Sequence, residues 1–360
     1  MAAGARLRAL LDMMAGAEQA RFLRRRSFAD QLLLKRAQQA GRYTSFADNV
    51  LRFEYKVSEA VCTGAGDTFP LTSLIAIMDE TTTWASIGLD PNRRPGVSIS
   101  MDAHLIRPQP VRAGEVLIFC SSLVKHGRTL GFLECSVEDE SGARMAWGKH
   151  VKFLESEFAD LDRDCFCSCT HALCSSEALL TSSCRLACAV GRTWNLLFSD
   201  QMFPLTSAMV RFTSGPSRPQ PPLHPRLGDV LRLEAQSVAA DGTTTFNFDC
   251  GEDHLNELGV MHGACQAVLH GSATEAVVID APAAGRDHVT LDAPREARVL
   301  KDASVTYLSA GRKGPLILRV TPLRRDGAGE SYVSKLMTKH GLRVLSEATL
   351  LYGPQYIPAR

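Results

Sequence analysis

The chain repeats one order of secondary-structure elements, and this repetition restricts its fold more than any other feature. Residues 51–57 alternate apolar and polar side chains as a half-buried strand does, and residues 71–87 carry apolar side chains at helical spacing. Four strand-like runs joined by short turns follow: 97–106, 116–125, 130–138 and 144–154. The second half predicts the same order: a strand at 244–250, a helix at 263–279, and strands at 304–308, 315–324, 332–340 and 343–352. This repetition predicts an α+β protein built by duplication.

The bulk composition is that of an ordinary globular protein. The chain has 360 residues, of which 45% are hydrophobic and 22% charged, enough for two domains with their own cores. A formal net charge of +1 and the lack of a basic stripe interleaved with aromatic residues argue against a nucleic-acid-binding protein. No apolar run approaches the roughly 18 residues of a membrane span, so we expect none.

We expect four segments along the chain: an N-terminal extension at 1–45, a first domain at 46–154, a linker or insertion at 155–228 and a second domain at 229–360. The extension holds many arginines and few acidic residues, which is typical of a mitochondrial targeting segment. An amphipathic surface helix is the alternative. Localisation is therefore expected to be mitochondrial or cytoplasmic, with the arginines favouring the mitochondrion.

The linker is rich first in cysteine and then in proline. Six of the eleven cysteines lie between Cys165 and Cys188, and no signal-like apolar core precedes them, so a reducing compartment is favoured over a disulfide framework. The spacing from Cys165 to Cys174, which includes His171, offers zinc ligands but lacks the usual paired C-x2-C arrangement. A variable surface insertion without metal is the preferred interpretation.

Two short motifs are divided between the halves. The first half has Met78-Asp79-Glu80 inside its predicted helix, and the second half has the run from Asn256 to His262-Gly263 before its own. A shift of 192 positions pairs Gly64 with Asn256, Pro70 with His262, Leu71 with Gly263 and Asp79 with Gly271. Each half thus keeps what the other half lacks: one has the acid, and the other has the Asn and the His-Gly turn.

Both motifs resemble the start of the central helix in hotdog-fold acyl-CoA thioesterases of the PaaI and 4-hydroxybenzoyl-CoA type. There, Asn-x-x-Gly-x-x-His-Gly-Gly is followed by an acid eight residues after the first glycine of the pair. The run from Pro95 through Gly-Val-Ser98 to Pro108 is similar to the next strand of that family, which carries a serine. In the second half this strand aligns at a shift of about 202, which puts Leu300 at the serine position. The resemblance covers about 46–154 and 229–352.

The resemblance implies tandem hotdog domains, each a long central helix wrapped by a curved antiparallel sheet, paired as a pseudodimer. It also implies hydrolysis of acyl-CoA thioesters at one composite site between the halves, with coenzyme A present only as part of the substrate. The residues it assigns to catalysis are Asp79, Ser98, Asn256, His262 and Gly263. Weaker candidates for contacts with the coenzyme A phosphates are Lys125, Arg128 and Arg312.

In the implied mechanism, the N–H at the start of the second helix would polarise the thioester carbonyl, because a helix N-terminus has unpaired donors and a favourable dipole. Asp79 would act as general base on a water molecule or as direct nucleophile, and Ser98 and Asn256 would hold the water. On its helical position alone, Asp79 is more readily interpreted as a solvated carboxylate beside Glu80, but the context from Met78-Asp79-Glu80 to Trp84-Ala85 favours a functional role.

Two other functional classes remain open. One is a catalytically inactive hotdog scaffold or acyl-CoA-binding protein, since neither half has a complete motif. The other is a hotdog hydratase or dehydratase, which needs a His paired with an acid on its active helix, and no acid follows His262 at that spacing. We expect His254 and His270 to be structural and Glu275 to lie on the surface. A homodimer of the whole chain is a further expectation.

Overall fold

The computed structural model describes Phe28 and residues 41–62, 68–90, 96–107, 111–154, 231–256, 259–280, 298–326, 329–341 and 343–354. The expectations for Gly64, for the cysteine-rich linker and for most of the N-terminal extension lie outside these residues. None of the helices in the described ranges has the length and apolar character needed to cross a membrane.

Within the described residues, each half consists of one long helix and a set of antiparallel strands. The first half contains β1 (Gly41–Ala47), β2 (Val50–Lys56), α3 (Leu71–Leu89), β4 (Val97–Leu105), β6 (Val116–His126), β7 (Leu130–Asp139) and β8 (Arg144–Phe153). Two-residue strands β3 (Thr68–Phe69) and β5 (Val111–Arg112) pair beside it. The second half contains β9 (Glu234–Val238), β10 (Thr244–Cys250), α8 (Gly263–Asp280), β11 (Arg298–Tyr307), β12 (Gly314–Asp326), β13 (Gly329–Thr338) and β14 (Val344–Pro354). This confirms the predicted α+β hotdog fold.

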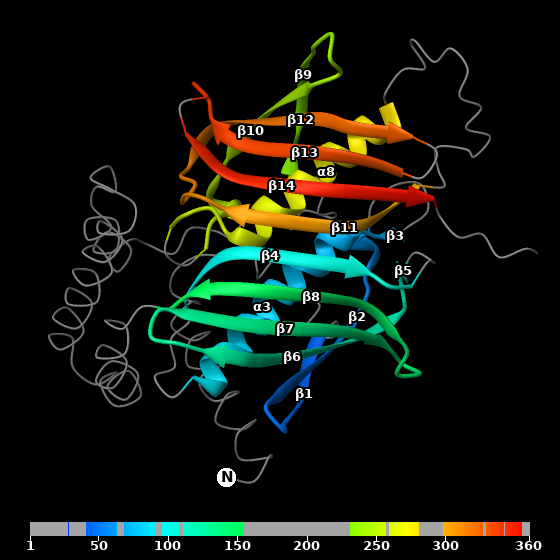
Figure 1. Ribbon diagram of the computed structural model, residues 1–360, viewed down its shortest axis with the longest axis vertical. Coiled ribbons are helices and arrows are strands. Elements are labelled where there is room, and N and C mark those ends of the chain that lie inside the picture. Colours follow the sequence, from blue (N-terminus) through cyan, green and yellow to red (C-terminus); the bar gives the residue numbers. More distant parts are fainter. Residues whose placement is uncertain are drawn as a thin grey trace, which may run out of the picture.

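The two halves share one sheet of twelve strands. Its order is β1-β2-β6-β7-β8-β4-β11-β14-β13-β12-β10-β9, so β4 and β11 are the neighbours at which the halves meet. They run antiparallel, with pairs from Asp302 opposite His104 to Thr306 opposite Ser100. Figure 1 shows this junction in the middle of the molecule, with both helices on the same side of the sheet. The continuous sheet holds α3 and α8 next to each other.

Sequence patterns located both helices and most strands but missed the outer hairpin strands β1 and β9. β1 begins at Gly41, ahead of the expected domain boundary at residue 46. Its turn into β2 uses Asp48 and Asn49, both with positive φ, which is the two-residue hairpin geometry that matches the twist of a sheet. The side chains of β9 are all exposed, so this strand lacks the alternation that marks a half-buried one.

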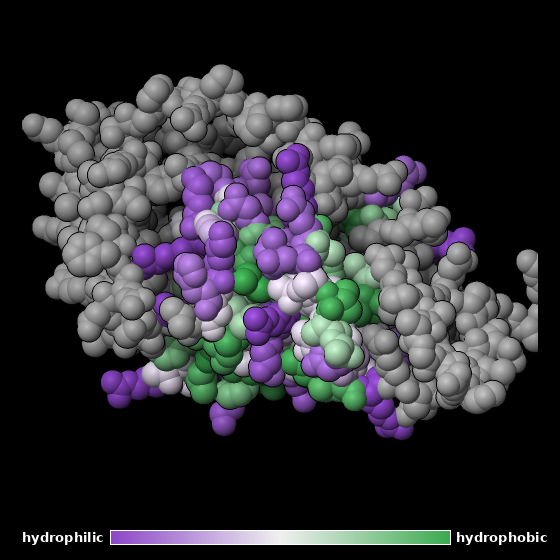
Figure 2. All heavy atoms as spheres, turned by 90° about the horizontal axis from the view of Figure 1, so that it is seen from above, coloured by the Kyte–Doolittle hydropathy of each residue, from purple (hydrophilic) through white to green (hydrophobic). Residues whose placement is uncertain are grey.

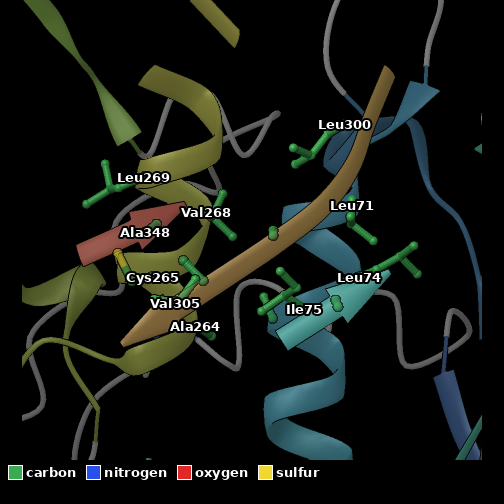
Figure 3. Close-up of a cluster of buried hydrophobic side chains, with 14 of the residues drawn as sticks. Leu71, Leu74, Ile75, Ala264, Cys265, Val268, Leu269, Leu300, Val305 and Ala348 are labelled. Atoms are coloured by element: carbon green, nitrogen blue, oxygen red, sulfur yellow. The ribbon is translucent and has the colours of Figure 1, made fainter. Parts of the chain in front are cut away.

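The two helices are antiparallel and approach closely where small residues meet. At one end of the pair, Gly271 of α8 faces Thr72 of α3, whose Cγ2 would lie 2.3 Å from a Cβ built on the glycine. At the other end, Gly263 of α8 faces Asp79 of α3. Apolar side chains fill the space between the helices and the sheet (Figure 3). The two ends have equivalent places in the helix pair but differ in chemistry.

Strand register supports the internal alignment. Ser98 of β4 pairs with Lys152 of β8 just before a bulge, and Leu300 of β11 pairs with Tyr352 of β14 just before a bulge. Leu300 therefore occupies the position of Ser98 in its own half, as the shift of about 202 predicts. By the same register, His150 corresponds to Leu350.

The sheet has one face against the helices and one face outward. Buried apolar residues of both halves form one continuous core around the helices, which includes Tyr55, Phe119 and Tyr332. Viewed from the β9 side, hydrophilic and hydrophobic side chains of the described residues are interleaved on the surface (Figure 2). Buried polar side chains such as His150 and Lys152 lie on the face of the sheet that packs against α3.

Gly271→Ala tests the close approach of the helices. Alanine normally stabilises a helix interior by about 1 kcal/mol relative to glycine. At Gly271 the added methyl meets Thr72, so we expect a loss of about 1–3 kcal/mol in the free energy of unfolding. The measurement is urea unfolding, with Gly88→Ala at an exposed position of α3 as control. A stabilisation at both glycines would contradict the packing.

Candidate active site

Asp79 lies in the middle of α3 with its side chain turned into the protein. The residue is only 3% exposed, so the interpretation of Asp79 as a solvated helix acid is wrong. Its neighbour Glu80 is also buried and accepts a 2.9 Å hydrogen bond from the indole of Trp84. The two adjacent acids therefore have different surroundings, and only Asp79 faces the second half of the chain.

A chain of hydrogen bonds orients the Asp79 carboxylate. The Ser98 hydroxyl donates to Oδ1 of Asp79 at 2.9 Å, and Nε2 of His150 lies 2.9 Å from the same hydroxyl. Because Ser98 gives its only proton to the carboxylate, its oxygen must accept from Nε2. The other ring nitrogen, Nδ1, lies 2.7 Å from the hydroxyl of Thr82, which also donates to the backbone carbonyl of Met78. The chain fixes both the serine and the acid.

His150 acts in this network as a neutral ring. Burial lowers its pKa to about 3, with Lys152 also disfavouring protonation and Asp79 opposing these effects. Sequence reasoning missed both His150 and Lys152. A sequence signal for them did exist. Both are polar residues at inward-facing positions of the predicted strand 144–154, where the other inward-facing residues are apolar.

Lys152 is the buried cation nearest to the network. It is 3% exposed, and its Nζ donates a 2.7 Å hydrogen bond to Thr83, which itself bonds to the backbone carbonyl of Asp79. Burial lowers the pKa of Lys152, while the negative charges of Asp79 and Glu80 favour its ammonium form.

The surroundings keep Asp79 ionised. Burial alone would raise the pKa of this carboxyl. The basic groups of His150, Lys152 and His262 and the Ser98 hydrogen bond outweigh burial and hold the pKa below its ordinary value. Since His150 is neutral at physiological pH, we assign the main electrostatic support there to Lys152.

The second half contributes the start of α8 to the same place. A Cβ built on Gly263 would lie 3.7 Å from Oδ2 of Asp79 and 3.5 Å from the ring of Tyr307. The N–H of Ala264 donates to Nδ1 of His262 at 3.1 Å, whereas the N–H of Gly263 has no hydrogen-bond partner among the described residues. An unpaired donor at a helix start thus lies close to a buried carboxylate.

His262 caps the helix. Its Nδ1 is 3.6 Å from Oδ2 of Asp79, too far for a hydrogen bond, and it already accepts the Ala264 N–H. The ring of Phe28 packs 6.2 Å from the His262 ring, and the Phe28 N–H bonds to the carbonyl of Leu255. Phe28 and the loop before α8 therefore support the position of His262.

Asn256 lies in that loop. Its backbone N–H donates to the carbonyl of Val260 at 2.8 Å, and its Oδ1 lies 3.3 Å from the Val260 N–H. Gly259 completes the turn with a φ of +74°. The structure thus brings together Asp79, Ser98, His262 and Gly263, and it gives Asn256 a role in shaping the turn.

The remaining candidates lie elsewhere. Lys125, Arg128 and Arg312 are exposed, so their proposed phosphate contacts stay a prediction. His270 is enclosed between the hydroxyls of Ser334 and Ser346 at 2.8 and 2.9 Å, as expected for a structural histidine. Nδ1 of His254 accepts the N–H of Gly251. Glu275 is half-buried, contrary to the expected surface position, and its charge contributes to raising the pKa of Tyr352.

At the opposite end of the helix pair, the described positions equivalent to Asp79, Ser98, His150 and Lys152 carry other side chains. Figure 3 shows Leu71 and Leu300 at that end. Leu350 and Tyr352 correspond to His150 and Lys152 there. Thr72 fills the space at Gly271 that an acid would need. Among the described residues, no group of His, Cys, Asp and Glu side chains is arranged to hold a metal ion.

No protein-family model and no curated protein matches the chain. Solved structures similar to it are hotdog-fold thioesterases. An acyl-ACP thioesterase from Bacteroides thetaiotaomicron is 9% identical, with 86% of this chain and all 100% of that chain covered, at a TM-score of 0.47. A hot dog fold protein of unknown function from Alicyclobacillus acidocaldarius is 11% identical over 92% and 98% of the two chains, at 0.48. Zebrafish thioesterase superfamily member 2 is 28% identical over 33% of this chain and 84% of its own, at 0.30. At these TM-scores, function must be argued from the site itself.

Lys152→Met tests the electrostatic account of Asp79. Removing the ammonium leaves burial as the stronger influence, so the pKa of Asp79 should rise. The measurement is the carbon-13 chemical shift of the Asp79 carboxyl during a pH titration. Lys149→Met is the matched control, because Lys149 is exposed and lies over the Trp147 ring. An unchanged or lower Asp79 pKa in the Lys152 variant would show that another group supplies the charge.

Proposed function

We propose that the protein hydrolyses acyl-CoA thioesters to free acid and coenzyme A at one composite site per chain. The observation that carries this proposal is the meeting of two groups from different halves: the buried Asp79 carboxylate and the unpaired N–H of Gly263. Hydrolysis of a thioester needs both a group that delivers an oxygen nucleophile and a donor for the developing oxyanion.

The Gly263 N–H would receive the thioester oxygen. The α8 dipole favours negative charge there, and a glycine lets the carbonyl approach the backbone closely. In a preorganised site, one such donor contributes about 100-fold or more to the rate. His262 holds the first turn of α8 by capping Ala264.

Asp79 would accept a proton from water as the water oxygen bonds to the carbonyl carbon. The tetrahedral species then collapses, the C–S bond breaks, and the coenzyme A thiolate leaves and takes up a proton. Alternatively, Asp79 attacks the carbonyl directly and water hydrolyses the resulting anhydride. In both routes Ser98, held by His150, fixes the reacting carboxylate oxygen or water.

Several finer features belong to the same proposal. Lys125, Arg128 and Arg312 would contact the coenzyme A phosphates, and the Arg-rich segment at 1–45 would direct the protein to mitochondria, where lipid metabolism supplies acyl-CoA. The functional units would be the domains at 46–154 and 229–360 joined by the linker at 155–228, and the chain would form a homodimer.

A hydratase or dehydratase is a weaker alternative. That chemistry needs a histidine that shuttles a proton next to an acid. His262 does lie near Asp79 across the interface, but its Nδ1 accepts the Ala264 N–H and is not directed at the carboxylate by a hydrogen bond. If the protein were an inactive acyl-CoA-binding module, replacing Asp79 would change no hydrolytic activity.

Asp79→Asn should reduce kcat by at least about 100-fold while the protein stays folded, because an amide keeps the shape but neither accepts a proton nor attacks the carbonyl. The assay detects free thiol released from a panel of acyl-CoAs. Glu80→Gln is the matched control, since it alters the neighbouring buried acid that bonds Trp84 and should retain most activity. Equal turnover by wild type and Asp79→Asn would refute the assignment.

A further inference from the structure

Tyr307 is a polar residue of the candidate site that the sequence analysis did not single out. It lies at the C-terminal end of β11, in the second half. A Cβ built on Gly263 would lie 3.5 and 3.6 Å from the Tyr307 ring atoms Cε1 and Cζ. The same Cβ would lie 3.7 Å from Oδ2 of Asp79. The Tyr307 ring therefore borders the space between the glycine and the acid.

The Tyr307 hydroxyl is buried and has no hydrogen-bond partner among the described residues. Leaving a buried hydroxyl unpaired destabilises a protein. Burial, together with the charge of Asp79, raises the pKa of Tyr307 well above its ordinary value, so the group stays a phenol that can donate. A bound substrate could supply the hydrogen-bond acceptor that the Tyr307 hydroxyl lacks in the free protein.

The opposite end of the helix pair offers an internal comparison. The register that aligns Ser98 with Leu300 also aligns Leu105 with Tyr307, because Leu105 pairs with Ala146 and Tyr307 pairs with Ser346. The hydroxyl is therefore present at the end that has Asp79, and an alkyl group replaces it at the end where Gly271 occupies the equivalent position. If the Tyr307 ring only filled space, its hydroxyl would not need to occur at the same end as Asp79.

We propose that the Tyr307 hydroxyl is a second hydrogen-bond donor to the thioester oxygen of the substrate, acting beside the Gly263 N–H. This inference rests on the proposed thioesterase function and adds a catalytic residue to it. Two donors from different elements, a helix start and a strand end, would enclose the oxyanion, while Asp79 and Ser98 from the first half supply the nucleophile. The second half would then contribute both oxyanion donors.

Tyr307→Phe keeps the ring and removes only the hydroxyl. We expect kcat for acyl-CoA hydrolysis to fall about 100-fold with little change in KM, since a donor to the oxyanion acts most strongly in the transition state. The melting temperature should stay the same or rise, because the lost hydroxyl has no partner in the free protein. Tyr332→Phe is the matched control: its hydroxyl bonds to Glu330, so this variant should lose stability and keep its kcat.

The outcomes separate this inference from the proposed function. An active wild type and a Tyr307→Phe variant with the same kcat would overturn the role of Tyr307 and leave the thioesterase proposal intact. A fall in the melting temperature as large as that of Tyr332→Phe would also overturn it, because the hydroxyl would then have a partner within the protein. A wild type that hydrolyses no acyl-CoA in the panel would refute both proposals.

Discussion

The close antiparallel packing of α3 against α8 is the constraint on which the rest of the structure depends. The β4–β11 junction makes one sheet of the two halves and holds the helices together, so that each helix start meets the middle of the other helix. At one end this brings the start of α8 to the buried acid, and at the other it presses Thr72 onto Gly271. A site formed in this way belongs to neither half alone. In the proposed composite site, each half supplies the part of the motif that the other half lacks.

Hydrogen bonds and a nearby positive charge stabilise the buried carboxylate of Asp79. Taking a carboxylate out of water is costly unless hydrogen bonds and an opposite charge compensate. Ser98 supplies the hydrogen bond, neutral His150 fixes the direction of that bond, and Lys152 supplies charge from a separate anchor on Thr83. The equivalent positions of the second half, Leu300, Leu350 and Tyr352, carry none of these groups, and Gly271 has no acid for them to support. The acid and the three side chains that stabilise it are thus present together in the first half and absent together from the equivalent positions of the second half.

Much of this arrangement could be predicted from the sequence. Helical periodicity located α3 and α8, and the motif comparison identified Asp79, Ser98 and the His262-Gly263 turn and paired Leu300 with Ser98. His150, Lys152 and Tyr307 could not be found in this way. Strand alternation indicates that such residues face inward, but what they meet depends on which strands are neighbours, and only the three-dimensional register reveals that. β9 was missed because its exposed side chains leave no periodic signal.

We infer that each chain has one working site and that the opposite end of the helix pair is closed. Isothermal titration with a non-hydrolysable acyl-CoA analogue, in which a methylene replaces the thioester sulfur, tests it most directly. We expect saturation at one analogue per chain and no binding to Gly263→Val, whose added side chain would fill the space between Asp79 and the Tyr307 ring. Binding of two analogues per chain, or full affinity in the Gly263→Val variant, would contradict it.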